Sequence, residues 1–252
     1  KPNSLRLLKM IEHHIDIKTQ HGDMNTFITH PEENGPFPTV LFYMDAPGKR
    51  EELHDMARRI ATTGYCVMLP NLYYRKTREF LFERTESGME TMFEMTRHLS
   101  LELILADTQA LLDYADQFEH ADASRVGTVG YCMSGPFVFK AAAVYTDRIQ
   151  CAASIYGANL VTARSDSPHL SAEHITGEMY FACAEIDPYA PKETIEQLLL
   201  QLEQTNINYR LEWYPGAEHG FAFPGRGDIY HKASAERHWE RLHALFDRNL
   251  SH

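Results

Sequence analysis

The fold of this chain is decided by one stretch, Val126-Gly127-Thr128-Val129-Gly130-Tyr131-Cys132-Met133-Ser134-Gly135. A short β-prone run meets a tight turn, and an apolar helical pattern begins near Pro136. The turn reads Gly-x-Cys-x-Ser, a variant of the nucleophile elbow Gly-x-Ser-x-Gly, in which the nucleophile occupies a strained position between a strand and a helix. The residues two before and two after the nucleophile must be small, and Gly130 and Ser134 meet that requirement.

This elbow makes Cys132 a candidate nucleophile. Its thiol is expected to project from the end of a strand at the N-terminus of a helix, where the helix dipole and free backbone N–H groups favour a thiolate and a developing oxyanion. The alternative interpretation is a small buried core residue, because free cysteines are often buried. The rest of the chain has to distinguish the two.

Composition and charge narrow the class of protein. The chain has 252 residues with 44% hydrophobic residues, and we interpret residues 1–252 as a single α/β domain. A net charge of −11 argues against a nucleic-acid partner. No apolar run is long enough to cross a membrane, and residues 1–18 contain no signal-peptide core, so we expect a cytoplasmic protein.

The cysteines predict no metal site and no cofactor. None of the four forms a CxxC pair, and no Cys/His cluster has zinc spacing. Three of them lie in apolar, strand-like runs and are expected to be reduced core residues, namely Cys66, Cys151 and Cys183.

The order of elements predicts the architecture. Strands are expected at 12–19, 25–30, 39–44, 65–69, 126–131, 151–156, 179–183 and 209–213. Helices are expected at 50–63, 101–118, 136–144, 192–205 and 231–249. Such alternation predicts the α/β class with an α/β-hydrolase fold, a mostly parallel central sheet flanked by helices on both faces. Residues 73–99 interrupt the alternation and are expected to be an excursion over the core, a candidate lid.

Two further side chains follow strands in the order that an α/β hydrolase requires. Asp187 follows the strand at 179–183, and His219, flanked by glycine, follows the strand at 209–213. Parallel sheets bind ligands at the carboxyl ends of their strands. The chain order Cys132, Asp187, His219 is that of the α/β-hydrolase triad. Asp187 alone could be a turn residue, and any one of 14 histidines could be incidental, so the prediction rests on the combination.

The same geometry predicts an oxyanion hole. One donor is the backbone N–H of Met133, the residue after the nucleophile, and the second comes from the loop after the strand at 39–44. Pro47 has no N–H, so Ala46 is the best second donor. Asp45 is then expected near the thiol.

With these residues in place, most of the chain, from about Glu12 to the final helix, resembles the dienelactone hydrolase family. The family's Gly-Tyr-Cys-x-Gly-Gly elbow is matched by residues 130–135, with Ser134 in place of a glycine. Residues 70–73 (Pro-Asn-Leu-Tyr) are similar to its Pro-Asp-Leu-Tyr, and residues 216–221 (Gly-Ala-Glu-His-Gly-Phe) to its Gly-x-x-His-x-Phe.

The resemblance also implies roles for charged residues. In that family a glutamate in the first-strand loop holds the resting thiol, and Asp45, one methylene shorter, occupies the matching position. Members that act on dienelactone bind the substrate carboxylate with arginines, one of them soon after the catalytic histidine. Phe223 stands near that place here, and the nearest arginine is Arg226. The segment at 73–99 offers further arginines, among them Arg75, Arg78 and Arg84.

The preferred hypothesis is a hydrolase of small-molecule esters or lactones that uses a Cys132–His219–Asp187 triad and a thioester intermediate. One alternative is a carboxylesterase on the same fold with Ser134 as nucleophile, although Pro136 would then fit the tight elbow poorly. The other is a non-hydrolytic binding or redox-sensing module that uses Cys132. We expect a monomer or a small homo-oligomer.

Overall fold

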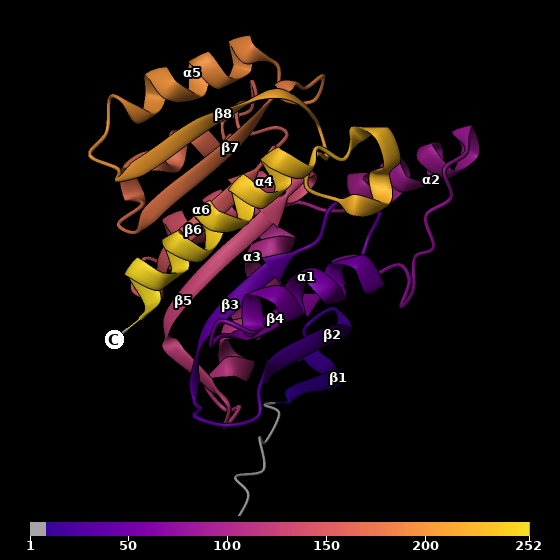
Figure 1. Cartoon of the computed structure of the whole chain (residues 1–252), viewed down its shortest axis with the longest axis vertical. Coiled ribbons are helices and arrows are strands. Elements are labelled where there is room, and N and C mark those ends of the chain that lie inside the picture. Colours follow the sequence, from indigo (N-terminus) through magenta and orange to yellow (C-terminus); the bar gives the residue numbers. More distant parts are fainter. Residues whose placement is uncertain (1–8, 252) are drawn as a thin grey trace, which may run out of the picture.

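The computed structural model describes residues 9–251 and is built on one eight-stranded sheet (Figure 1). The strand order is β1-β2-β4-β3-β5-β6-β7-β8. The first pair forms an antiparallel hairpin, and β2 is antiparallel to β4, whereas every pair from β4 to β8 is parallel. The bounds are β1 Met10–Thr19, β2 Gly22–Pro31, β3 Phe37–Tyr43, β4 Cys66–Pro70, β5 Ala121–Tyr131, β6 Ile149–Ile155, β7 Glu178–Ile186 and β8 Tyr209–Glu218.

Helices cover both faces of the sheet. In Figure 1, α1 (Glu51–Ala61) and α6 (Lys232–Leu250) lie in front of the sheet, and α3 (Leu101–Ala115) and α4 (Gly135–Val144) lie behind it. A fifth helix, α5 (Lys192–Leu202), follows β7, and three 3-10 segments lie at η1 (Cys132–Ser134), η2 (Pro168–His174) and η3 (Pro224–Ile229). The predicted α/β-hydrolase fold is confirmed.

The structure corrects two strand boundaries near the candidate site. The sequence indicated that β7 ends at Cys183 and β8 at Trp213, but the parallel pairing continues past a register shift to Ile186 and Glu218. Backbone pairing to the neighbouring strand decided these ends, because Glu185 and Glu218 are exposed polar residues that break the apolar pattern. Asp187 and His219, the residues that directly follow these two strands, therefore lie at the edge of the sheet.

The segment at 73–99, which we predicted to be an excursion, contains a helix. Residues 86–97 form α2, which Thr85 caps by accepting a hydrogen bond from the backbone N–H of Gly88 at 3.0 Å. Met92 is the one fully buried side chain of this helix. In Figure 1, α2 stands beside the η3 loop, away from the body of the sheet.

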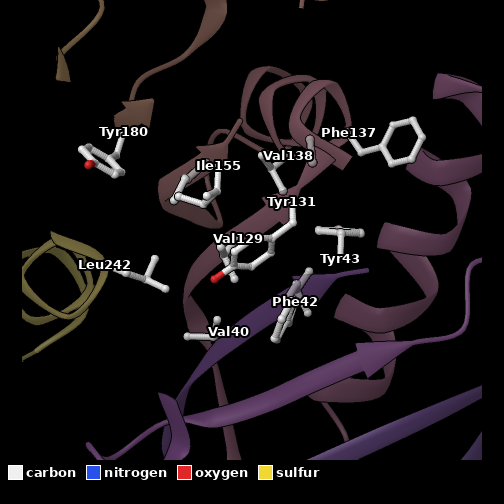
Figure 2. Close-up of a cluster of buried hydrophobic side chains, with 14 of the residues drawn as sticks. Val40, Phe42, Tyr43, Val129, Tyr131, Phe137, Val138, Ile155, Tyr180 and Leu242 are labelled. Atoms are coloured by element: carbon white, nitrogen blue, oxygen red, sulfur yellow. The ribbon is translucent and has the colours of Figure 1, made fainter. Parts of the chain in front are cut away.

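The core surrounds the strand that carries the elbow. Figure 2 shows Tyr131, the last residue of β5, among Phe42, Val129 and Val138. Its ring lies 5.4 Å from that of Phe42, and the side chain is fully buried. The residue before the candidate nucleophile is therefore held by the core itself.

Tyr131 also links the elbow to the last helix through a buried hydrogen bond. Its hydroxyl lies 2.9 Å from Nε2 of His238 in α6, and Nδ1 of His238 lies 2.7 Å from the carbonyl oxygen of Ala235. A carbonyl can only accept, so Nδ1 carries the proton and Nε2 accepts from the tyrosine. Burial lowers the pKa of His238 to about 4, so the imidazole is neutral in the folded protein.

We predict that His238 contributes to acid sensitivity. The unfolded chain protonates this imidazole near pH 6.5 and the folded chain only near 4, so stability is lost as pH falls through this window. The full shift corresponds to about 3 kcal/mol. A Tyr131→Phe/His238→Phe variant, which leaves no orphaned hydroxyl, should lose less unfolding free energy than the wild type between pH 7 and 4.5 in urea titrations. Identical losses would contradict the prediction.

Candidate active site

The elbow places Cys132 in a strained backbone conformation. Cys132 has a φ of 56°, in the left-handed region that non-glycine residues rarely adopt, and it stands between the end of β5 and η1. A Cβ at Gly130 would approach the carbonyl oxygen of Ser134 to 2.4 Å, so only glycine fits there. The thiol is partly exposed, whereas the other three cysteines are buried.

A second close approach holds the elbow helix to the sheet. A Cβ at Gly135 would lie 2.4 Å from Cα of Gly157, so α4 begins in direct contact with the loop after β6. The N–H of Ala158 in that loop donates to the carbonyl oxygen of Cys132 at 3.0 Å. The backbone on both sides of the thiol is thus fixed by neighbours.

Ser134 lies beneath the elbow. Its side chain is fully buried, and its hydroxyl donates to the carbonyl oxygen of Met44 at 2.5 Å. This bond ties the elbow to the end of β3. The hydroxyl is therefore engaged with the backbone, whereas the Cys132 thiol faces the adjoining cavity.

Asp187 and His219 meet at the same edge of the sheet. One carboxylate oxygen of Asp187 lies 2.8 Å from Nδ1 of His219, and the other accepts from the backbone N–H groups of Tyr189 and Ala190. The carboxylate therefore orients the ring with the proton on Nδ1, and the turn after β7 orients the carboxylate. The imidazole is packed between the rings of Tyr156 and Tyr189, at 5.0 and 4.8 Å.

Burial and two neighbouring side chains act in opposite directions on the pKa of His219. Burial alone would lower the pKa of His219, but the hydrogen bond with Asp187 and the nearby Cys132 side chain outweigh it and raise the pKa to about 9. Nε2 is buried and has no hydrogen-bond partner within the described residues 9–251. This nitrogen is the one left available for chemistry at the thiol.

The candidate oxyanion donors line the same cavity as Cys132. Met133 follows the thiol directly, and Ala46 belongs to the loop after β3. The hydroxyl of Tyr73 donates to the carbonyl oxygen of Ala46 at 2.8 Å and contacts the sulfur of Met133 at 3.5 Å. Tyr73, which the sequence singled out only through its motif, therefore braces both candidate donors.

Asp45 is fully buried and is engaged by two arginines. One oxygen accepts from Arg50 at 2.5 Å, and the other accepts from Arg226 at 3.2 Å. Arg50 also pairs with Glu52 at 2.8 Å. Both guanidinium groups stack on the buried ring of Phe223, at 5.2 and 5.5 Å from its centroid. The assignment of Asp45 as a thiol-holding carboxylate stays a prediction.

This cluster includes two residues that the sequence analysis missed. Arg50 was expected only as the start of a helix, and Glu52 as part of it, yet Glu52 also accepts from the N–H of Gly225 at 2.7 Å. The five-residue separation between Asp45 and Arg50 in one turn was the only sequence signal that could have predicted their ion pair. The contact to residue 225 joins segments that no local pattern connects.

The arginines of the 73–99 segment go to three different places. Arg75 pairs with buried Asp107 at 2.6 Å, and neither residue lines the cavity of Cys132, whereas Arg78 pairs with exposed Asp16 at 2.8 Å. Arg84 lines the cavity, where it donates to the carbonyl oxygen of Gly225 at 2.5 Å, and Arg97 lines it as well.

The cavity over these groups is large, about 1,600 Å³. It extends from Cys132 and His219 to the inner side of α2. Within residues 9–251, no three metal-binding side chains are grouped in a way that could hold a metal ion. No helix in that described range is long and apolar enough to span a membrane.

An eight-stranded sheet with this strand order, a strained elbow and a His–Asp pair at its carboxyl edge define an α/β hydrolase. The sequence model of the dienelactone hydrolase family matches residues 24–250. The chain therefore belongs to the dienelactone hydrolase family, and the resemblance seen in the sequence is confirmed.

Individual relatives agree with this membership. A Synechocystis sp. protein assigned as a carboxymethylenebutenolidase is 27% identical over 246 residues, covering 94% of this chain and 99% of the relative. A Bradyrhizobium protein assigned as a 2-oxo-3-(5-oxofuran-2-ylidene)propanoate lactonase is 24% identical over 231 residues, 89% of each chain. The crystal structure of a Klebsiella pneumoniae protein assigned as a dienelactone hydrolase superposes with a TM-score of 0.86 at 25% identity, covering 95% and 99%.

The elbow geometry predicts a specific instability. Gly130→Ala should lower the free energy of unfolding by about 3 kcal/mol or more, because the new Cβ meets backbone that cannot move aside. Gly216→Ala is the matched control: it strains a φ of 68° but meets no atom within 4 Å, so about 1 kcal/mol is expected. Urea denaturation of both variants measures the difference, and equal losses would refute it.

Proposed function

We propose that this chain hydrolyses ester or lactone bonds through Cys132, His219 and Asp187, with a thioester intermediate. One arrangement carries the proposal. Cys132 has a strained backbone and lines the cavity, and Asp187 orients the imidazole of His219, which lines the same cavity. The names of the relatives, which include a carboxymethylenebutenolidase and a lactonase, support the substrate class.

In the proposed acylation, Cys132 is the nucleophile, His219 transfers the proton and Asp187 orients His219. The thiol of Cys132 gives its proton to His219 Nε2, which forms a thiolate and an imidazolium. The thiolate sulfur attacks the carbonyl carbon, and the carbonyl electron pair moves to oxygen, where the N–H groups of Met133 and Ala46 stabilise it. When the tetrahedral intermediate collapses, the C–O bond breaks and the leaving alkoxide takes the proton of His219 Nε2. Asp187 stabilises the imidazolium before this transfer.

Deacylation reverses the proton transfer. His219, now neutral at Nε2, takes a proton from water as the water oxygen attacks the thioester carbon. The C–S bond then breaks, the carboxylic acid is released, and the thiolate and imidazolium are restored. The ion pairs of Asp45 with Arg50 and Arg226 hold the loop that carries Ala46, so we assign these residues a positioning role.

The two alternatives have less support. A Ser134 nucleophile would need an accessible hydroxyl, but this one is buried and donates to Met44. A purely binding or redox module has no need for an aspartate that orients a histidine toward the thiol. Both alternatives are nevertheless separable by experiment.

Cys132→Ala should lower kcat/KM for p-nitrophenyl acetate by about a thousandfold or more, because the nucleophile is gone. Ser134→Ala should keep kcat/KM within about tenfold and cost about 1 kcal/mol of stability through the lost bond to Met44. Mass spectrometry of quenched wild type should find the acyl group on the Cys132 peptide. The opposite pattern of losses would assign Ser134, and no turnover by wild type with retained ligand binding would favour the binding module.

The raised pKa of His219 predicts the alkaline side of the pH profile. With an alkyl ester, whose leaving group needs a proton, kcat/KM should fall as pH rises through about 9, where the imidazolium is lost. Asp187→Asn removes a group that raises this pKa and leaves burial, which lowers it. The alkaline limb should therefore move to lower pH in that variant. An unchanged limb would show that His219 does not set it.

A further inference from the structure

The cavity beside Cys132 is far larger than a small lactone requires. Its volume of about 1,600 Å³ exceeds the range of roughly 300–1,000 Å³ that is typical of small-molecule sites. Part of its wall is formed by α2, the helix that interrupts the strand–helix alternation. The shape and chemistry of that region bear on which substrates fit.

The walls of this region are mainly apolar. α2 and the loop before it contribute aromatic and thioether side chains, and α4 contributes Phe137 from the opposite side. The apolar residues within 80–93 that line the cavity are Phe80, Leu81, Phe82, Met89, Met92 and Phe93. An apolar surface of this kind gains free energy when an apolar ligand group displaces water from it.

The cations around the cavity are already compensated or exposed. Arg50 pairs with Asp45 and Glu52, and Arg226 pairs with Asp45. Arg164 pairs with Asp166 at 2.8 Å.

The remaining two cavity arginines, Arg84 and Arg97, are exposed to solvent. A carboxylate on the substrate would therefore meet either guanidinium groups whose charge Asp45 and Glu52 already balance, or a solvent-screened contact.

We propose that the substrate is a neutral ester whose acyl or alcohol part is a long or bulky apolar group that lies under α2. This inference rests on the proposed function and specifies its substrate class. The ester carbonyl lies at Cys132, and the apolar group extends from there along Phe137 toward Met92 and Phe93. The ion-paired arginines act as part of the wall rather than as anion-binding groups.

The first test is chain length. Each methylene that is transferred from water to the apolar wall should raise kcat/KM about fourfold. Between p-nitrophenyl butyrate and octanoate, or between butyl and octyl acetate, we expect a rise of at least about tenfold in one series. Equal rates along both series would overturn the inference. Turnover of p-nitrophenyl acetate by wild type and its loss in Cys132→Ala would still stand, so failure here is distinguishable from failure of the proposed function.

The second test is charge at constant length. Mono-p-nitrophenyl suberate replaces the terminal methyl of the octanoate ester by a carboxylate. We expect kcat/KM at least about tenfold below that of the octanoate ester. A preference for the carboxylated ester would overturn the inference and assign a cavity arginine to the substrate carboxylate.

A variant of α2 locates the apolar group. Phe93→Glu should lower the octanoate-to-acetate ratio of kcat/KM at least about tenfold, because it puts a carboxylate on the cavity wall. Thr91→Glu is the matched control, since it adds the same charge at an exposed position of the same helix that does not line the cavity. Phe93→Ala serves as a second probe that adds no charge and should lower the ratio in the same direction. A ratio unchanged in both Phe93 variants would place the apolar group elsewhere and overturn the assignment to α2.

Discussion

The left-handed backbone of Cys132 is the constraint on which the rest of the site depends. A φ of 56° at a non-glycine residue costs of order 1–3 kcal/mol and persists only where the surroundings hold it. Here the holding contacts come from three directions. Tyr131 is anchored in the core and to His238, Ser134 is bonded to Met44, and Gly135 lies against Gly157. These contacts hold the backbone so that the thiol stays partly exposed at the cavity.

The same constraint explains why the partners of the thiol arrive where they do. All strands from β4 to β8 are parallel, so their carboxyl ends meet at one edge. Asp187 and His219 each follow directly on a strand, and the Asx-type turn after Asp187 fixes its carboxylate through two backbone N–H groups. The sheet thus positions the histidine, and the turn sets its tautomer.

Local sequence patterns encode part of this fold and of the candidate site. The buried strands, the elbow and the order of Cys132, Asp187 and His219 follow from local patterns and from one rule of parallel sheets. The ends of β7 and β8 could not be predicted from local patterns, because pairing between the two strands extended both of them through polar residues. The Arg84–Gly225 and Glu52–Gly225 contacts join segments 141 and 173 residues apart, and no local signal encodes such contacts.

The buried ion pairs of Asp45 balance the charge at one wall of the cavity. A carboxylate with no exposed surface requires partners, because an unpaired buried charge is costly. Arg50 and Arg226 are these partners, and the negative charge of Asp45 partly neutralises their positive charge. Breaking either pair to bind a substrate anion would leave Asp45 short of a partner. The same interaction that holds the Ala46 loop in place therefore makes the cavity floor electrically balanced, and shape and apolar contact are left to select the substrate.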